Sequence, residues 1–427
     1  MTQIEIKDKA TMHFQQQIDA AAAQGGGTVT VPPGQHLIGT LQLKSGVRLH
    51  LEHGAVLLGS ADLADYPLRS EFPIRCRADQ NGFRSLIYAE SVRDIALTGS
   101  GTIDGNGAVF SCGGHDRDGR PRLIQMIDCE NVLVEGLQLR NAGMWLQHYL
   151  GCRRLRIRGL TAWNHGQPNN DFLDLEGCRD VRVSECSSDT DDDGITLKSG
   201  CAAPTEDVVV TGCIIRSNCN AIKLGTESNG GFRNIVVANC VIAPSENPTN
   251  IHGHPGGICG IAVECVDGGV LDGVDVSQIT MHGPKIPIFI RLGNRARPFL
   301  AGGERTGVGQ LRNVRISGVT GTGHDAHACI FSGLPGHPIE NIFLSDLNLE
   351  CEGGHDQAPE VSEFPEKEAD YPEATMFGLL PAAGIFIRHA RNVQMNRVYL
   401  HLRKPDLRPL LALADAEVQA DGQRVSV

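Results

Sequence analysis

A short apolar pattern recurs along most of the chain and constrains its fold more than any other feature. Each copy reads apolar, any residue, apolar, two small or polar residues, and then an apolar residue or cysteine. The copies end at Leu137, Leu160, Cys186, Cys213, Cys240, Ile279, Val319, Leu347 and Val398. The first four spacings are 23, 26, 27 and 27 residues, and the later ones stretch to 39, 40, 28 and 51, which indicates inserted loops. Such a period is typical of a solenoid.

The pattern predicts an all-β chain wound as a parallel β-helix. Leucine-rich repeats share the period, but they need a Leu-x-x-Leu-x-Leu lattice and a helical segment, and neither is evident. Three short strands per coil fit a β-helix whose coils stack about 4.8 Å apart. Equivalent residues then form ladders, and we expect Cys186, Cys213 and Cys240 to be small apolar fillers of one ladder rather than disulfides or metal ligands.

The ends of a solenoid must be covered. In residues 11–23, Phe14, Ile18 and Ala21 or Ala22 recur at helical spacing before a run of three glycines, which predicts a helix over the N-terminal end. No linker interrupts the chain after this helix. We therefore predict a single domain over residues 1–427, with about 1–27 as the cap, about 28–405 as coils and about 406–427 as a C-terminal tail.

Composition excludes several classes of protein. The 38 basic and 50 acidic residues give a formal charge of −12, which disfavours nucleic acid as a partner. The chain has no run of 18 apolar residues, so we expect no membrane span. The first residues do not resemble a secretory signal, so we expect a cytoplasmic protein as written, or a periplasmic or secreted one had a signal been removed.

Three consecutive coils carry polar residues where a strand begins, in segments 169–175, 191–198 and 219–227. Alignment of their apolar positions places Asp171, Asp193 and Asn220 in one outward ladder. Asp174, Thr196 and Lys223 follow three residues further on, inside the strands, and we expect them in a second ladder on the same face. Asp192 precedes its strand, where a bend turns it toward the same cleft.

Stacked carboxylates repel each other, so the pKa of one of them should rise. A protein obtains a protonated acid and an ionised base at one pH in this way. Glycoside hydrolysis needs such a pair, and inverting enzymes hold the two groups roughly 6.5–9.5 Å apart to admit a water. The alternative interpretations of the acidic run at 189–193 are a solvated turn or a cation site.

At these motifs the sequence resembles the polygalacturonase family, glycoside hydrolase family 28, as a divergent bacterial-type member. The similarity runs from residues 17–23 through GGGTVTVPPG and LHLEHGAVLLGS to the C-terminal LPAAGIFIRH. The Asn-Thr-Asp motif of the family corresponds to Asn169-Asn170-Asp171, and its Asp-Asp motif to Asp192-Asp193. The resemblance implies a right-handed parallel β-helix, Asp192 as general acid, and Asp171 and Asp193 as activators of the water, with inversion.

Two family motifs are altered in this sequence. Asn220 stands at the histidine of Gly-His-Gly, and Ala262-Val263-Glu264 replaces the Arg-Ile-Lys that holds a substrate carboxylate in the family. Glu264 would repel a uronate, so it is expected to accept hydrogen bonds from neutral sugar hydroxyls unless a cation from elsewhere restores the anion site. The candidate cations are Lys198, Lys223, Arg233 and Arg291.

The remaining site predictions are binding roles. We expect the substrate-binding residues to be Asn169, Asp174, Lys198, Asn220, Lys223, Glu227, Glu264 and Arg291. Trp145 is either a sugar-stacking or a core residue. The pair His252 and His254 has no recognisable zinc spacing, so we expect no metal and no cofactor.

The sequence thus predicts an inverting hydrolase of pectin-related oligo- or polysaccharides, of galacturonan or rhamnogalacturonan type, that is a monomer or small homo-oligomer. Long loops near 60–85, 106–122, 243–258 and 353–380 are expected to build the cleft, and closure of one end would favour exo action. The alternatives are a polyuronide lyase that uses Ca²⁺ and β-elimination, and a non-catalytic carbohydrate-binding solenoid.

Overall fold

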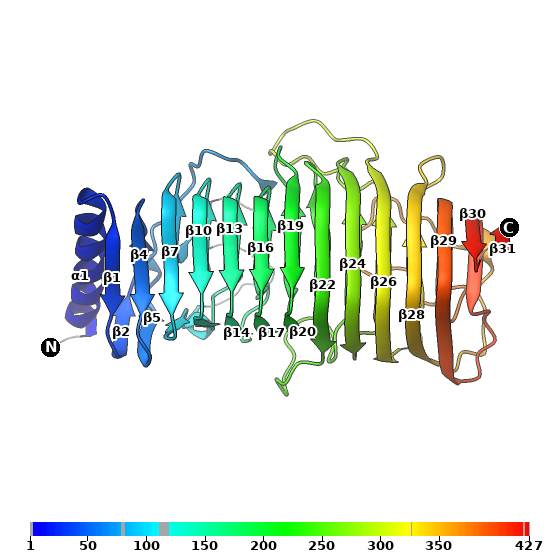
Figure 1. Ribbon diagram of the computed structural model, residues 1–427, viewed down its shortest axis with the longest axis horizontal. Coiled ribbons are helices and arrows are strands. Elements are labelled where there is room, and N and C mark those ends of the chain that lie inside the picture. The colour runs from blue at the N-terminus through cyan, green and yellow to red at the C-terminus, as the bar shows by residue number, and fades with distance from the viewer. Residues whose placement is uncertain (1–2, 78–81, 111–118, 326, 422, 427) are drawn as a thin grey trace.

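The chain forms a helix of stacked β coils. The computed structural model describes residues 3–77, 82–110, 119–325, 327–421 and 423–426. In these ranges, 31 strands form one continuous sheet, and the strand pairings are parallel except that between β30 and β31 (Figure 1). The predicted right-handed parallel β-helix is confirmed, with the hand that parallel crossovers take in nearly all sheets.

The strands form three ladders that run along the axis. The first contains β1 (Gly27–Val31), β4 (Val47–Leu51), β7 (Arg93–Gly99), β10 (Glu130–Glu135), β13 (Arg153–Arg158), β16 (Arg179–Ser184), β19 (Thr205–Thr211), β22 (Phe232–Ala243), β24 (Val270–His282), β26 (Gln310–His324) and β28 (Ile339–Gly353). The second contains β2 (Gly34–Ile38), β5 (Ala55–Gly59), β8 (Thr102–Asp104), β11 (Gln138–Arg140), β14 (Thr161–Asn164), β17 (Ser187–Thr190) and β20 (Ile214–Ser217), and the long strand β22 continues into it.

The third ladder contains β3 (Leu41–Gln42), β6 (Ser85–Glu90), β9 (Arg122–Ile127), β12 (Gln147–Leu150), β15 (Leu173–Glu176), β18 (Ile195–Ser199), β21 (Asn220–Ser228), β23 (Cys259–Cys265), β25 (Ile286–Leu292), β27 (Cys329–Ser332) and the start of β29 (Ile385–Lys404). Short 3₁₀ turns at Leu63–Asp65, Gly107–Val109 and Val361–Glu363 lie in the connections.

The interior is filled by alternate side chains of each strand. Val181 of β16 pairs in register with Val208 of β19, and both are fully buried, as the period of two requires. The predicted ladder of Cys186, Cys213 and Cys240 is confirmed, because the Cys213 thiol contacts both of its neighbours in this buried stack. The 13 cysteines among the described residues are all free.

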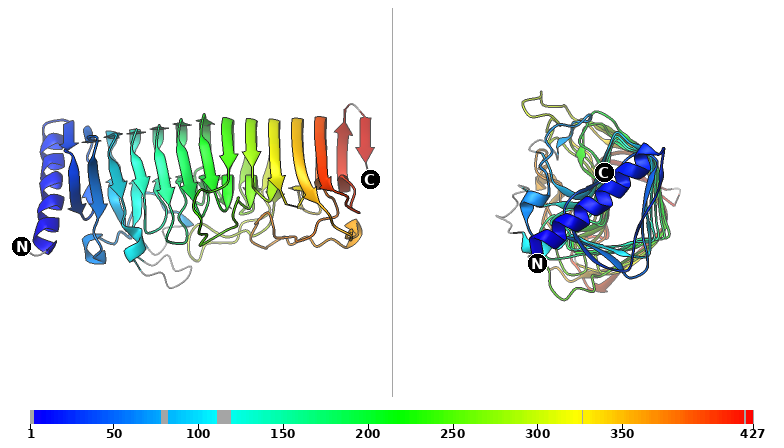
Figure 2. Two further views of the ribbon diagram at one scale, coloured as in Figure 1. Left: turned by 90° about the horizontal axis from the view of Figure 1, so that it is seen from below. Right: turned by 90° about the vertical axis from the view of Figure 1, so that its left-hand side faces the viewer.

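The two ends of the β-helix differ in detail from the prediction. The cap, α1 (Gln3–Ala23), covers the first coil and is longer than residues 11–23 (Figures 1 and 2). Its Phe14 and Ile18 are buried in the core, as expected. The predicted tail after residue 405 is wrong, because β30 (Leu411–Ala420) continues the coils by parallel pairing with β29. β31 (Gln423–Ser426) then folds back antiparallel on β30.

Figure 2, left, shows long connections gathered along one side of the helix. This arrangement places the loops beside the third ladder. In the described part of the chain, no helix has the length and apolar character needed to cross a bilayer.

Candidate active site

The third ladder brings the predicted polar residues into register. Leu173 pairs with Ile195, and Ile195 with Ile222, as the sequence alignment predicted. Asp174, Thr196 and Lys223 therefore stack on the outward face of β15, β18 and β21. The acids that precede these strands must lie close together, because each coil adds one strand spacing.

Asp171, Asp192 and Asp193 converge as predicted. Each offers a carboxylate oxygen that lies within 4.8 Å of an oxygen of the other two. All three are buried, with exposed fractions of 3, 8 and 3%. We call these three residues the trio. Their nearest oxygens lie closer together than the roughly 6.5–9.5 Å that separates the two carboxyl groups of an inverting pair.

The bend predicted at Asp192 is held by side chains of neighbouring residues. The Asp192 amide donates to Asn170 Oδ1 at 2.7 Å, and its carbonyl accepts from Thr190 Oγ1 at 2.8 Å and from Ser217 Oγ at 2.6 Å. Amide and hydroxyl groups thus satisfy backbone groups that leave the strand ladder at the turn. The carboxylate of Asp192 is thereby turned toward Asp171 and Asp193.

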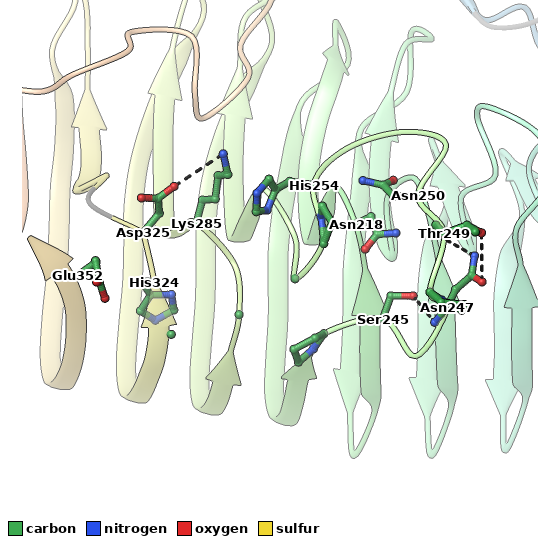
Figure 3. A pocket seen from close by; sticks show the side chains of 16 residues that line it. Asn218, Ser245, Asn247, Thr249, Asn250, His254, Lys285, His324, Asp325 and Glu352 are labelled. Carbon is green, nitrogen blue, oxygen red and sulfur yellow. Dashed lines mark hydrogen bonds and ion pairs between the residues drawn. The ribbon is translucent and has the colours of Figure 1, made fainter. Parts of the chain in front are cut away.

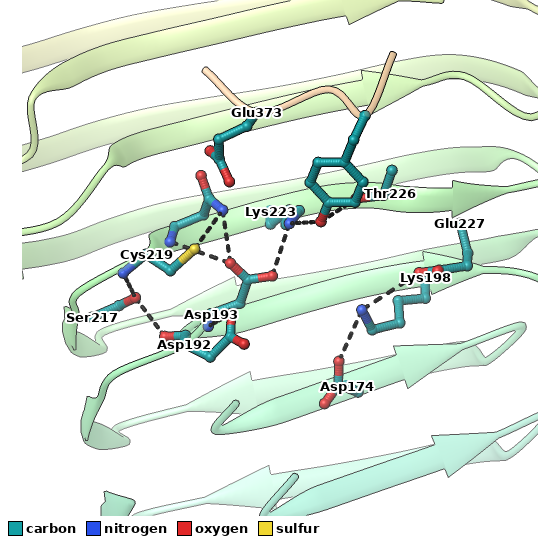
Figure 4. A network of polar contacts seen from close by, with 12 residues as sticks. Asp174, Asp192, Asp193, Lys198, Ser217, Cys219, Lys223, Thr226, Glu227 and Glu373 are labelled. Atoms are coloured by element: carbon teal, nitrogen blue, oxygen red, sulfur yellow. Dashed lines mark hydrogen bonds and ion pairs between the residues drawn. The ribbon is translucent and has the colours of Figure 1, made fainter. Parts of the chain in front are cut away.

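Asp193 is held as an ionised carboxylate. Lys223 Nζ lies 2.9 Å from its Oδ2, and Asn220 Nδ2 donates to its Oδ1 at 2.7 Å (Figure 4). Burial alone would raise the pKa of Asp193, but Lys223 and Lys198 together with these hydrogen bonds lower it. Asn220 therefore stabilises the negative charge of Asp193.

Asp171 and Asp192 have the opposite electrostatic environment. Burial and the charge of Asp192 raise the pKa of Asp171 well above its usual value. Burial and the charge of Asp193 raise the pKa of Asp192. The site therefore combines a proton-holding carboxyl with an ionised one, the requirement for general acid and general base in one cleft.

Lys198 lies between two carboxylates on the same side of the cleft. Its Nζ is 3.4 Å from Asp174 Oδ1 and 3.6 Å from Glu227 Oε2, and it lies over the Trp145 ring at 5.0 Å from the centroid. Glu227 also accepts from Arg297 Nη2 at 3.2 Å. Trp145 is buried against Lys198, Arg122 and His148, so it offers no stacking face to a sugar.

Glu264 occupies the outward face of β23, one coil beyond β21. It is fully buried, and neither carboxylate oxygen has a hydrogen-bond partner among the described residues. Gly225 makes room for it, since a Cβ there would lie 2.9 Å from Glu264 Oε2. Burial raises the pKa of Glu264 to about 8, against the opposing charge of Lys223.

Two of the predicted cations do not join this site. Arg291 is buried, and it donates to Ser332 Oγ at 2.7 Å and to the Glu366 carbonyl at 2.8 Å, so its guanidinium is not free to bind a sugar carboxylate. Arg233 is exposed on the first ladder, opposite Asp272 of the next coil. Asn169 lies beside the trio in sequence, and its Oδ1 accepts from Arg120 Nη2 at 3.1 Å.

A connection over residues 358–383, here called the strap, covers the coils that follow the acids. Its apolar side chains pack on the outward faces of β23, β25 and β27, and this cluster contains Ala262, Phe289, Ile330, Ala374, Phe377 and Leu380. The strap also reaches the trio. The Tyr371 hydroxyl lies 3.4 Å from Lys223 Nζ and 3.1 Å from Thr226 Oγ1, and Glu373 lies beside Lys223 (Figure 4).

A second connection over residues 244–257, here called the flap, borders the trio on another side. His252 Nε2 lies 4.0 Å from Asp192 Oδ2. Flap residues, His254 among them, form one wall of a groove of about 540 Å³, which is also lined by Asn218 and by Lys285, Asp325 and Glu352 from later coils (Figure 3). The flap thus contacts Asp192 through His252 and contributes to the lining of the groove.

Two sets of described residues have ligand atoms close enough to share a metal ion. One is the trio itself, and the other is Asp192, Cys219 and His252. The first offers only carboxylate oxygens, as hard cations prefer, and the second offers one oxygen, one sulfur and one nitrogen. Both sets contain Asp192, so a bound ion would compete with its protonation.

Comparison with known proteins identifies the family. The model of the glycosyl hydrolases family 28 matches residues 23–369, most of the chain. This chain belongs to that family. A probable polygalacturonase of Vitis vinifera is 29% identical over 262 residues, which are 58% of this chain and 53% of that protein, and the chain spans about half the length of the curated relatives it matches.

Solved structures of family 28 members share the fold. The exopolygalacturonase of Yersinia enterocolitica superposes with a TM-score of 0.74 at 20% identity, over 97% of this chain and 76% of that one. A hyperthermoactive exopolygalacturonase of Thermotoga maritima gives 0.69 at 21% identity, over 92% and 88% of the two chains. At these identities the likeness establishes the β-helix and nothing about substrate.

This family 28 member also has site residues that the sequence did not reveal. Tyr371 and Glu373 come from a loop about 150 positions after Lys223, at a separation of 148 residues for Tyr371. No repeat pattern marks them. Asn170 was part of a recognised motif, and its contact with the Asp192 amide could have been suspected from the polar pair that precedes Asp171.

Proposed function

We propose that this protein hydrolyses glycosidic bonds of a pectin-related oligo- or polysaccharide with inversion at the anomeric carbon. The observation that carries the proposal is the convergence of Asp171, Asp192 and Asp193, with a raised pKa for two of them and a lowered pKa for the third. Family membership favours hydrolysis over the lyase and binding-protein alternatives.

The roles follow from the environments of the three carboxyls. Asp192, whose pKa is raised, donates its proton to the glycosidic oxygen as the bond to the leaving sugar breaks. Asp193, kept ionised by Lys223, accepts a proton from the attacking water. Asp171, whose carboxylate lies within 4.8 Å of both of the others, helps to orient that water.

Inversion rests on the family resemblance and not on the carboxylate spacing. The nearest oxygens of the trio are closer than the separation associated with inverting pairs. The stereochemistry is therefore a separate test. Proton NMR of the first product should show the anomer opposite to that of the substrate bond, and the same anomer would indicate retention.

The substrate class follows from the charges around the trio. Lys198 and Lys223 are each paired with carboxylates, and Glu264 stands where an anion site would need a cation. A chain of uronates alone would therefore be a poor substrate. A pectic chain that places a neutral sugar beside the strap, as rhamnogalacturonan can, should bind better than a chain of uronates alone.

The strap supports action at a chain end. It packs on the outward faces of the coils beyond β21 and reaches Lys223, so it would obstruct a polymer that extends past the trio in that direction. An exo-acting enzyme needs a cleft closed at one end. At the earliest reaction times we expect a single short sugar as product, while the viscosity of the polymer solution falls little.

The test is a panel of polygalacturonate, rhamnogalacturonan and neutral oligosaccharides, assayed for new reducing ends and for ultraviolet-absorbing unsaturated products. The Asp192→Asn variant should lose activity by at least about 100-fold while its circular dichroism is unchanged, since general acid catalysis contributes roughly 10²–10⁴-fold. Asp207→Asn, at an exposed position of β19 where the backbone has a positive φ that Asn tolerates, is the matched control. Hydrolysis by Asp192→Asn at the normal rate would overturn the assignment.

A further inference from the structure

His165 lies between two buried carboxylates next to the catalytic turn. Its Nε2 is 3.1 Å from Asp189 Oδ1, its Nδ1 is 3.2 Å from Asp191 Oδ2, and its side chain is 6% exposed. Nε2 forms a hydrogen bond with Asp189, and Nδ1 lies within ion-pair distance of Asp191, so the two carboxylates together favour the doubly protonated imidazolium. Burial lowers the pKa of His165, but Asp189 and Asp191 outweigh it and raise the pKa to about 9.

One side of this bridge holds the turn that carries Asp192. Asp191 is fully buried, and it accepts from Asn218 Nδ2 at 2.9 Å and from Asn170 Nδ2 at 3.2 Å. Asn170 in turn accepts from the Asp192 amide at 2.7 Å. The chain of contacts from His165 to the backbone of Asp192 therefore has no gap.

The other side of the bridge holds the flap. Asp189 accepts from Ser245 Oγ at 2.5 Å through Oδ1 and from the Glu246 amide at 2.8 Å through Oδ2. These two residues begin the flap, whose His252 lies 4.0 Å from the Asp192 carboxylate. Loss of the cation would leave Asp189 and Asp191 to repel each other, and this would weaken the anchor that Asp189 provides, although Arg216 still pairs with Glu246 of the flap at 2.8 Å.

We propose that His165 is a positioning residue for the general acid, a charged clasp that joins the turn of Asp192 to the flap that borders it. The clasp rests on geometry alone, while the catalytic consequence rests on the proposed function, in which Asp192 gives its proton to the glycosidic oxygen. His165 keeps both of its protons throughout. Asp189 and Asp191 are the charged groups that face it, and the Trp163 ring packs on it with 4.6 Å between centroids.

The first test measures the clasp without any substrate. In hydrogen exchange at pH 7, His165→Gln should lower the protection of backbone amides in residues 244–257 and 190–193 by about 10-fold, with the first ladder unchanged. His389→Gln is the matched control, because His389 is likewise placed between two carboxylates, 2.9 Å from Glu366 and 2.9 Å from Asp415. Unchanged protection of the flap in His165→Gln would overturn the clasp.

The second test separates acid positioning from a general structural role. The probes are the oligosaccharide that the wild type cleaves fastest and the 4-nitrophenyl glycoside of its cleaved sugar, whose leaving group needs little protonation. His165→Gln should lower kcat by about 10- to 100-fold on the first and by less than about 3-fold on the second, with KM unchanged. His165→Arg, which keeps a cation with several donors, should recover part of the lost kcat on the oligosaccharide.

The outcomes distinguish the two proposals. Equal loss on both probes, with flap protection reduced, would leave the clasp standing and overturn its link to the general acid. Failure of the wild type to cleave any glycoside would contradict the proposed function, and the exchange experiment would still decide the clasp.

Discussion

Lys223 and Asp193 form an ion pair at 2.9 Å between β21 and the turn before β18, on the floor of the cleft. The pair has a double role. It keeps one carboxylate of the trio ionised, and through Tyr371 it links that carboxylate to the strap. Removing the lysine should therefore change both the pH dependence and the mobility of the strap.

Lys223→Met should shift the acid limb of the kcat/KM profile to higher pH. Because Lys223 is the group that most strongly lowers the pKa of Asp193 against burial, its loss raises that pKa, and the base becomes protonated at a higher pH. An opposite charge at this distance changes a pKa by roughly 1–3 units, so a shift of about one unit is expected. Lys404→Met, on the exposed surface, is the control, and an acid limb that stays in place would refute the role.

Glu264→Gln should flatten the dependence of stability on pH. The pKa of Glu264 is raised to about 8 in the folded chain, so the stability associated with its proton is present at low pH and is lost as pH rises toward 8. At pH 8 the variant should be more stable than the wild type by about 2–4 kcal/mol, with little difference at pH 4. Urea unfolding at both pH values measures this, with Glu52→Gln at an exposed site for comparison.

Tyr371→Ala should weaken substrate binding more than it slows chemistry. The Tyr371 side chain is 53% exposed next to the trio, so its ring can stack on a sugar, and an aromatic contact contributes about 0.5–1.5 kcal/mol. KM should rise by roughly 3- to 10-fold, and Tyr371→Phe should keep most of the affinity. Equal effects of the two substitutions would assign the role to the hydroxyl and its contacts with Lys223 and Thr226.

Chelation should leave turnover unchanged. The proposed reaction uses carboxyl groups to move protons, whereas a lyase of this fold would hold its substrate through Ca²⁺. Activity on the best oligosaccharide should therefore be the same before and after dialysis against EDTA. Loss on dialysis with recovery on adding Ca²⁺ would favour the elimination mechanism.

The sequence predicted the parts of the site that the repeat dictates. The register of Asp174, Thr196 and Lys223 follows directly from the apolar positions beside them, because parallel coils align equivalent residues. The position of Asp192 required one bend, which the acidic run suggested. These are local relationships, separated by a single coil.

The parts that could not be predicted come from long connections. Tyr371 reaches Lys223 across 148 positions, and the path of the strap depends on apolar contacts that have no period. Arg291 was misjudged for the same reason: its strand was foreseen, but the carbonyls that occupy its guanidinium belong to the strap. The last coil, which contains β30, was not predicted because the apolar residues of β30 are mainly alanines, and alanine has a low preference for strands.

The anchoring of the strap has a consequence for how the molecule matures. Arg291 and Arg388, from separate late coils, both donate to the Glu366 carbonyl, so this anchor exists only when those coils are in place. Each coil of a stacked helix is stabilised by its neighbours, and the acids lie three coils before Arg291. Under the proposed action at chain ends, a molecule whose late coils have not yet formed would have its acids in place without the strap that covers one end of the cleft, and it would also cleave internal bonds of the polymer.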